Sequence, residues 1–246
     1  MKPRKGIHIL PSLFTTGNVF CGFYAFVAVL NEDFYHAAWA IVVGMIFDGL
    51  DGRIARLTKT TSAFGMQYDS LADIITFGMA PAFLAYAWVL KPFGRLGWMA
   101  AFLFLLCTAL RLARFNVTKP DTHGSHFIGL PSPAAAVVVA SIVIAFEELF
   151  ATKINPFIMV MVIYGLAFLM VSNIKYPAFK KLDFKKRVAF SRFLFVILFF
   201  YVLATIPRVA LFILGITYTV IGPIGIFLKN RDTVVQEKTT PPNLTL

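Results

Sequence analysis

Four aspartates occur at helical spacing between residues 47 and 78 of this 246-residue chain, in a stretch flanked by apolar sequence. Asp48 and Asp51 are three residues apart, and Asp69 and Asp73 are four apart, so each pair shares one helix face. A short linker joins the two predicted helices, which can then lie antiparallel and bring the four carboxylates into one small volume. Because no histidine or cysteine accompanies the aspartates, their oxygens suit Mg²⁺ or Mn²⁺, with Ca²⁺ as a third candidate, and not zinc.

Holding four ionised carboxylates close together in an apolar region costs free energy, which limits the roles that they can have. Carboxylates that lie close together raise one another's pKa, and a charge at mid-bilayer costs about 3 kcal/mol even on mild scales. Two divalent cations bridged by four carboxylates would relieve the repulsion and form a clamp of the kind used in phosphoryl chemistry. Intramembrane acids also serve proton relays and ion pathways, or pair structurally. The residues alone leave these three interpretations open.

Residues near the aspartates favour a phosphate ligand. Gly52 and Gly65 leave the backbone bare beside the predicted cluster, which lets a bulky group approach closely. Arg56 lies one turn after Gly52 and can neutralise a phosphate. Ser62 lies in the linker, where its hydroxyl would bind phosphate or cap the following helix.

The composition indicates how these residues are held. The chain is 59% hydrophobic and 14% charged, whereas a soluble domain carries roughly 25% charge. Its long apolar runs predict an all-α polytopic membrane protein with about eight transmembrane helices. The predicted spans are about 9–30, 34–57, 66–90, 95–115, 127–150, 154–173, 191–207 and 209–228. We expect residues 1–230 to form one transmembrane domain and residues 231–246 to be a disordered tail.

The distribution of basic residues predicts the orientation. Of the 23 Lys and Arg residues, 19 fall in the termini and in alternate connections, all on one predicted face. The positive-inside rule makes that face cytoplasmic, so both termini are cytoplasmic and the number of spans is even. The aspartates then lie at the cytoplasmic ends of the second and third helices. The net charge of +11 is explained by topology and by attraction to anionic lipids, so it does not indicate nucleic-acid binding.

The spacing of the motif also resembles a known family. The chain reads Asp48-x-x-Asp51-Gly52-x-x-Ala55-Arg56, followed after eight residues by Gly65, then Asp69 and Asp73 at intervals of four. This is similar to the signature of the CDP-alcohol phosphotransferases, with every fixed position filled. The resemblance implies that an alcohol attacks the phosphate of a CDP-linked lipid and that CMP leaves. It further implies two divalent ions held by Asp48, Asp51, Asp69 and Asp73, with Asp73 as general base, a CDP pocket shaped by Gly52, Arg56 and Gly65, and a homodimer.

Softer signals resemble the phosphatidylserine synthase branch of that family. They are the segments "LPSLFTTGNVFCGFYA", "CTALRLARFNV", "FIGLPSPAAA" and "VSNIKYPAFKK". The resemblance implies transfer of the phosphatidyl group from CDP-diacylglycerol to L-serine. The alternatives are the same chemistry with glycerol 3-phosphate or an inositol derivative, or a carboxylate-dependent cation transporter.

Residues outside the aspartate motif are the candidates for binding the substrates. Arg111 and Arg114 would bind the serine carboxylate, bind a phosphate on another acceptor, or only follow the positive-inside rule. Asn116 would contact the ammonium group. Asn18, inside the first apolar span, would lie near the nucleotide pocket or make an interhelical hydrogen bond. Pro131 and Pro133 suit a helix start and would otherwise line the acceptor pocket.

Overall fold

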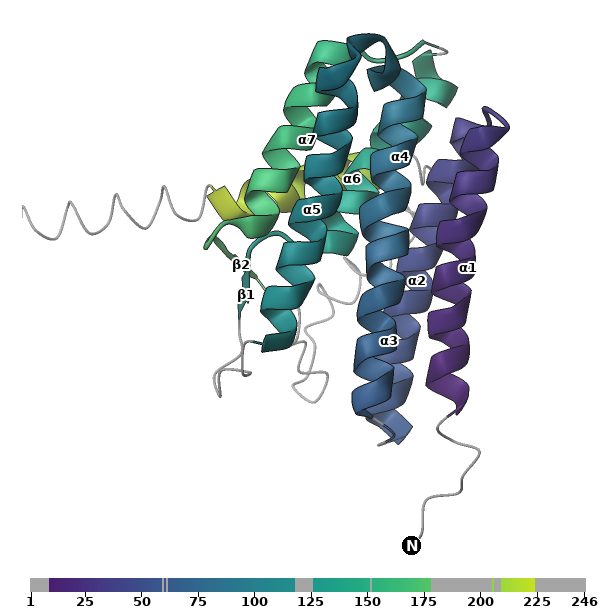
Figure 1. The fold of residues 1–246 in the computed structure, drawn as a ribbon, viewed down its shortest axis with the longest axis vertical. Coiled ribbons are helices and arrows are strands. Elements are labelled where there is room, and N and C mark those ends of the chain that lie inside the picture. Colours follow the sequence, from purple (N-terminus) through teal and green to yellow (C-terminus); the bar gives the residue numbers. More distant parts are fainter. Residues whose placement is uncertain are drawn as a thin grey trace, which may run out of the picture.

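The described residues form a helical bundle with one short pair of antiparallel strands (Figure 1). The computed structural model describes residues 9–58, 60, 62–117, 126–150, 152–177, 205 and 209–223. The α-helices are α1 (Ile9–Leu30), α2 (Phe34–Thr58), α3 (Ala63–Asp73), α4 (Ala80–Ala85), α5 (Arg95–Val117), α6 (Ser132–Ala145) and α7 (Pro156–Val171). The π-helical segments are η1 (Ile74–Met79), η2 (Tyr86–Leu90) and η4 (Phe146–Phe150), and η3 (Lys91–Phe93) is a 3₁₀ turn. Strands β1 (His126–Ile128) and β2 (Lys175–Pro177) pair, and a further helix covers Val209–Pro223.

The first two helices form an antiparallel pair joined by a tight turn. Glu32 adopts a left-handed conformation, with φ of 59°, which ends α1 and reverses the chain. The Asp33 carboxylate then accepts a hydrogen bond from the backbone N–H of His36 at 3.2 Å. This contact satisfies one of the unpaired donors in the first turn of α2. The turn therefore sets α2 beside α1, and α2 ends at the aspartates.

The predicted third span is a continuous helix from Ala63 to Phe93 that includes two π-helical segments. Ser62 begins it, because its hydroxyl oxygen accepts a hydrogen bond from the Gly65 N–H at 3.0 Å. Pro81 lies in the first turn of α4 and has no N–H to donate. The π-helical turn η1 comes immediately before it, and such a turn absorbs the missing hydrogen bond without breaking the helix.

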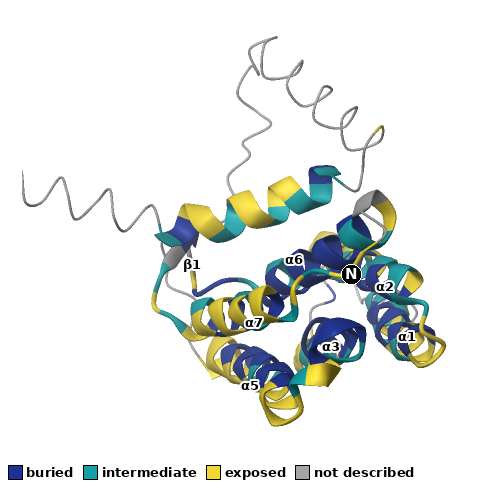
Figure 2. Cartoon of the chain, turned by 90° about the horizontal axis from the view of Figure 1, so that it is seen from above, coloured by how far each residue is buried: buried dark blue, intermediate teal, exposed yellow. Residues whose placement is uncertain are grey.

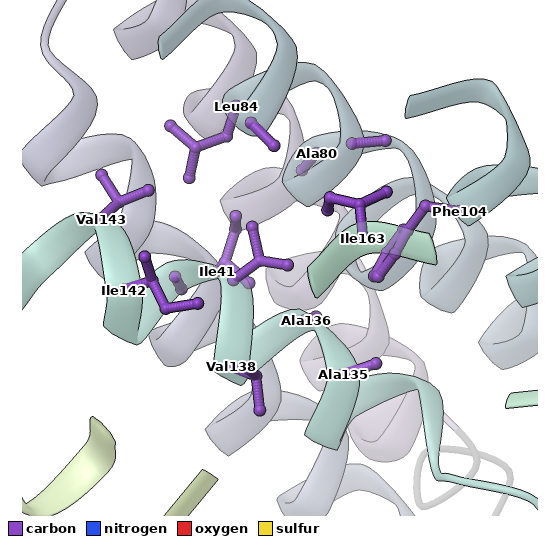
Figure 3. Packing of buried hydrophobic residues seen from close by; sticks show 14 of the residues in the cluster. Ile41, Ala80, Leu84, Phe104, Ala135, Ala136, Val138, Ile142, Val143 and Ile163 are labelled. Atoms are coloured by element: carbon purple, nitrogen blue, oxygen red, sulfur yellow. The ribbon is translucent and has the colours of Figure 1, made fainter. Parts of the chain in front are cut away.

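Helix α6 lies in the middle of the bundle, where it packs against α2, α4, α7 and the π-helical segment η1 (Figure 3). Twelve of its 14 residues are buried, and a helix that is apolar on every face is expected to be surrounded by protein. It contains many alanines, which let neighbouring backbones approach closely. Around it lie Ile41 of α2, Ala80 and Leu84 of α4, Phe104 of α5 and Ile163 of α7.

The outer surface of the bundle is apolar, whereas buried residues line the inner faces of the helices (Figure 2). Three helices are long and apolar enough to cross a membrane, namely those at Pro11–Leu30, Ala63–Phe93 and Arg95–Val117. Exposed phenylalanines such as Phe20 and Phe168 fit contact with lipid. The protein is therefore a membrane protein, as its composition predicted.

The predicted number of eight spans is not confirmed. Of the predicted seventh span, residues 191–207, only Thr205 lies within the described residues. The helix Val209–Pro223, predicted as the eighth span, lies across the bundle and not alongside its long helices (Figures 1 and 2). The predicted fifth span begins later than expected, at Ser132, because residues 126–128 form a strand that pairs with residues 175–177. The tail 231–246 lies outside the described residues.

Small residues of the long third helix pack inside the chain. Gly78 faces α5, where an added Cβ would lie 3.1 Å from the Leu105 side chain and 3.2 Å from that of Thr108. Ala82 is also buried, with 5% of its surface exposed. Both small residues are therefore occupied by contacts within one chain. The homodimer stays a prediction that rests on the family resemblance.

Candidate active site

Four carboxylates from two helices meet between the C-terminal half of α2 and the facing α3, as predicted. One carboxylate oxygen from each of Asp48, Asp51 and Asp69 lies within 4.8 Å of the other two. The Asp73 carboxyl lies within hydrogen-bonding reach of Asp48. Asp51 and Asp73 are nearly enclosed, with 4% and 8% of their surfaces exposed. The helical spacing and the short linker therefore bring the four side chains together.

Helix α1 supplies hydrogen bonds that hold two of these aspartates. The Thr15 hydroxyl donates to Asp51 Oδ2 at 2.9 Å, and Asn18 Nδ2 donates to Asp73 Oδ1 at 3.4 Å. Asn18 thus contacts the carboxylate cluster through an interhelical hydrogen bond, one of its two predicted roles. Thr15 was not predicted, although Thr15 and Asn18 lie three residues apart in an apolar span, which is a signal of a shared polar face.

Close backbone contacts fix the crossing of the helices beside the cluster. The Thr76 hydroxyl in η1 donates to the backbone carbonyl of Asn18 at 2.8 Å. Glycines of α1 and α2 leave room for this threonine, because a Cβ at Gly22 or at Gly44 would lie 2.6 Å from its side chain. Since Thr76 follows Asp73 by less than one turn, the contact sets the position of Asp73 relative to α1 and α2.

The donor set fits divalent cations. The Asp69 Oδ1 atom is buried and has no hydrogen-bond partner among the described residues. A buried carboxylate oxygen is normally paired with a hydrogen-bond donor or a cation, so a bound metal ion would satisfy it. Among the described residues, the cations that interact with the cluster are Arg56, acting on Asp51, and Arg111, acting on Asp73. Because four carboxylates exceed two guanidinium groups, and because all the ligand atoms are oxygens, hard divalent ions suit the cluster.

Besides Asn18, the four other residues predicted to bind the CDP moiety, namely Gly52, Arg56, Ser62 and Gly65, lie toward the connection between α2 and α3. A Cβ at Gly52 would meet only the flexible tip of Arg56, at 3.4 Å. Arg56 itself is exposed. Ser62 caps α3 through the Gly65 N–H, which is the structural role predicted for it. A Cβ added at Gly65 would lie 3.2 Å from the Ser62 hydroxyl oxygen. The missing side chain therefore leaves room for the Ser62 hydroxyl to accept the hydrogen bond.

The three predicted acceptor residues of α5 have different surroundings. Arg111 is buried, interacts electrostatically with Asp73, and donates from Nη1 to the Ser132 hydroxyl at 3.4 Å. Arg114 is exposed and donates to Asn173 Oδ1 at 2.6 Å. Asn116 donates to Ser70 Oγ at 2.9 Å. The structure therefore brings Arg111 to the aspartate cluster, whereas Arg114 and Asn116 join α5 to its neighbours.

The proline-rich segment before α6 forms a helix start, as predicted. Pro131 is the N-cap residue and Pro133 lies in the first turn. Ser132, between them, is completely buried and accepts the hydrogen bond from Arg111. A fully buried serine at a helix start was not singled out from the sequence, although the two flanking prolines mark the position.

Together, the apolar helical bundle and its cluster of four carboxylates define a membrane protein with a candidate divalent-metal site. Comparison with known sequences identifies the family. The sequence model of the CDP-alcohol phosphatidyltransferases matches residues 8–172 of this chain, which include all four aspartates. The chain belongs to the CDP-alcohol phosphatidyltransferase family.

Individual relatives match over most of the chain. The CDP-diacylglycerol–serine O-phosphatidyltransferase of Helicobacter pylori strain 26695 is 39% identical over 241 residues, covering 94% of this chain and 99% of the relative. The enzyme of the same name from Bacillus subtilis is 35% identical over 175 residues, covering 71% of this chain and 93% of the relative. A third enzyme of this name, from Methanocaldococcus jannaschii, is 40% identical over 143 residues, covering 56% of this chain and 62% of the relative.

Proposed function

We propose that this protein transfers the phosphatidyl group from CDP-diacylglycerol to L-serine, giving phosphatidylserine and CMP. The observation that carries the proposal is the convergence of Asp48, Asp51, Asp69 and Asp73 at the joined ends of two helices, with the family's spacing. The names of the relatives, each a CDP-diacylglycerol–serine O-phosphatidyltransferase, support serine as the acceptor.

The residues that would hold divalent cations are Asp48, Asp51 and Asp69, with Asp73 beside them. We propose two ions, Mg²⁺ or Mn²⁺, in line with the predicted two-metal arrangement. When bound, such ions neutralise the pyrophosphate and the charge that develops on the leaving phosphate. Thr15 orients the Asp51 carboxylate through its hydrogen bond, and the buried Asp69 Oδ1, which has no hydrogen-bond partner among the described residues, would serve as a ligand atom.

Asp73 is the proposed general base. It would take the proton of the serine hydroxyl as the hydroxyl oxygen forms a new bond to the phosphorus of the phosphatidyl group. The phosphorus–oxygen bond to CMP breaks in the same displacement, and CMP leaves with the bonding electrons. Asn18 donates to one Asp73 oxygen and so fixes the plane of the carboxylate. Phosphoryl transfer depends mainly on positioning and charge neutralisation, and these contacts supply the positioning.

Arg111 is the proposed partner of the serine carboxylate. Its guanidinium is buried, it interacts with Asp73, and its Nε has no hydrogen-bond partner among the described residues. A guanidinium recognises a planar carboxylate through two parallel hydrogen bonds. Binding the carboxylate here would direct the serine hydroxyl toward Asp73. On the other side of the cluster, Arg56, Gly52, Gly65 and Ser62 would contact the CDP moiety.

The proposed orientation places the site at the cytoplasmic membrane surface with both termini in the cytoplasm. It is supported by the 19 Lys and Arg residues on one predicted face and by the positive-inside rule. At that depth, serine and CMP exchange with the cytosol while CDP-diacylglycerol enters from the lipid.

One assay tests the function. Purified protein in detergent, with Mn²⁺ or Mg²⁺ and CDP-diacylglycerol, is given serine, glycerol 3-phosphate or inositol phosphate, and CMP release is measured. We expect CMP and phosphatidylserine with serine only, and we expect a chelator to abolish turnover until metal is restored. No CMP with any acceptor would overturn the enzyme proposal, and CMP with glycerol 3-phosphate but not serine would overturn the acceptor.

A further inference from the structure

The helix Val209–Pro223 lies on the outer side of α6 and α7 (Figure 2) and follows the segment that matches the family, which ends at residue 172. Its inward stripe has helical spacing and consists of Leu211, Gly215, Tyr218 and Gly222, none of which is exposed. Its opposite face is apolar and exposed, with Ile213, Leu214, Ile216 and Ile221. One side of this helix therefore packs against the bundle, and the opposite side is exposed.

Two glycines let this helix approach the bundle closely. A Cβ at Gly215 would lie 3.0 Å from the Val138 side chain of α6, and a Cβ at Gly222 would overlap the Tyr176 ring. Tyr176 is completely buried and its hydroxyl donates to the Thr219 carbonyl at 3.2 Å. Burial, reinforced by the neighbouring Tyr218 phenol, raises the pKa of Tyr176 to about 12. Tyr176 therefore holds the helix at a fixed distance from β2.

The helix held in this way brings Tyr218 to the Arg111 region. The Tyr218 ring lies 5.6 Å from the Tyr176 ring, centroid to centroid, and its phenol interacts electrostatically with the Arg111 guanidinium. Arg111 in turn contacts Ser132, the first residue of α6, whose N-cap residue Pro131 offers no side-chain cap. The uncapped start of a helix attracts anions through its free N–H groups. Arg111, Tyr218 and the start of α6 therefore all complement one negative charge.

We propose that Tyr218 binds the carboxylate of the acceptor serine together with Arg111, and that Tyr176 is a positioning residue that holds the last helix in place. The inference rests on the proposed function and assigns a specificity role to a helix that the aspartate motif does not include. The phenol hydroxyl donates one hydrogen bond, and the guanidinium supplies the charge and further donors. The buried and unpartnered Arg111 Nε points to a ligand at this place.

The first test compares two tyrosine variants. Tyr218→Phe removes one hydroxyl, and Tyr164→Phe makes the same change on α7, where Tyr164 is at the edge of exposure. We expect Tyr218→Phe to raise the KM for serine about tenfold, the size expected for one hydrogen bond to a charged group. The KM for CDP-diacylglycerol should stay unchanged. Equal serine KM values in Tyr218→Phe and wild type would overturn the proposal.

A carboxylate-free acceptor separates recognition from general damage. Serinol keeps the hydroxyl and the amine of serine but has a hydroxymethyl group instead of the carboxylate. If Tyr218 binds the carboxylate, Tyr218→Phe lowers kcat/KM for serine and leaves that for serinol nearly unchanged. A parallel fall for both acceptors would assign Tyr218 a purely structural role and overturn the inference.

The positioning role of Tyr176 is tested by disturbing its two contacts with the helix Val209–Pro223. Gly222→Ala places a methyl group against the Tyr176 ring and should raise the serine KM by displacing the helix. Tyr176→Phe removes only the hydroxyl that bonds to the Thr219 carbonyl and should raise the serine KM by a smaller factor. Gly165→Ala is the matched control, because a Cβ there meets no atom within 4 Å. An unchanged serine KM in both Gly222→Ala and Tyr176→Phe would contradict this role.

The outcomes for wild type keep the two proposals distinct. If wild-type protein releases no CMP with serine, the proposed function fails before any variant is compared. If wild type makes phosphatidylserine and the Tyr218 variant keeps the wild-type preference for serine over serinol, only the further inference fails.

Discussion

The aspartate cluster and the Arg111 region lie on two sides of Asp73, and they are built in different ways. The four aspartates of the cluster come from α2 and α3 at regular helical spacing, and α1, which directly precedes these helices in the chain, supplies two hydrogen bonds to them. The Arg111 region combines α5, the start of α6 and the last helix. Under the proposed roles, the chemistry common to the family resides in one local motif, whereas recognition of the acceptor draws on segments that only the folded chain brings together.

The largest effect should come from removing the group where the two regions meet. Asp73→Asn keeps the shape of the side chain but loses the proposed general base, and we expect kcat to fall by about 10² to 10⁴. Metal-dependent binding of CDP-diacylglycerol should be largely spared, as measured with labelled lipid. Asp33→Asn, at the other end of α2, is the control and should keep near-normal turnover. Normal turnover in Asp73→Asn would remove its role as base.

The next largest effect is expected at the arginine proposed to bind serine. Arg111→Lys keeps the charge but loses the planar donor fork, and we expect the KM for serine to rise about 10- to 100-fold. Arg114→Lys should have a much smaller effect, because Arg114 is exposed and donates to Asn173. Serine titrations at saturating CDP-diacylglycerol measure both values. An equal rise of the serine KM in both variants would contradict the proposal that the buried Arg111, and not the exposed Arg114, binds serine.

A smaller effect is expected on the metal side. Thr15→Val keeps the side-chain shape and removes the hydrogen bond to Asp51. Partners of metal ligands typically change metal affinity by 10- to 100-fold, so the Mn²⁺ concentration for half-maximal activity should rise about tenfold. Thr16→Val is the neighbouring control, since Thr16 bonds to Ser12 and Tyr68 and not to an aspartate. A raised serine KM with unchanged metal dependence would contradict the separation of the two sides.

The smallest effect concerns stability. Gly44→Ala brings a methyl group to 2.6 Å from Thr76 Cγ2, and overpacking of this kind costs about 1 to 3 kcal/mol. We expect a lower Tm in detergent. Adding Thr76→Ser removes that methyl and keeps the hydroxyl that bonds to Asn18, so it should restore much of the Tm. Gly49→Ala, whose Cβ meets nothing within 4 Å, should not lower the Tm.

The meeting of the four aspartates could be predicted because helical spacing and a short linker leave few arrangements. The start of α6 at Pro131 and the cap at Ser62 were predictable for the same reason, since both depend on local backbone chemistry. In each case the residues that interact are close in the sequence.

Contacts between distant segments could not be predicted in this way. Arg111 and Arg114 are three residues apart on one helix, about 60° around its axis, so spacing does not tell which one turns toward Asp73. The bond from Thr15 to Asp51 depends on how α1 crosses α2. The apolar segment 209–223 has the composition of a span, and composition does not reveal that it lies across the bundle.

The π-helical turn η1, directly after Asp73, has a consequence for the evolution and engineering of the chain. A π-helical turn holds one residue more than an α-helical turn does, so η1 has the form of a one-residue insertion in a regular helix. Deleting one residue from it would restore the regular helix and rotate everything that follows by about 100°. Gly78 and Ala82 would then leave the positions where they now pack, while the aspartates kept theirs. The extra residue thus allows the aspartates before η1 and the packing residues after it to point in directions that a regular helix could not combine.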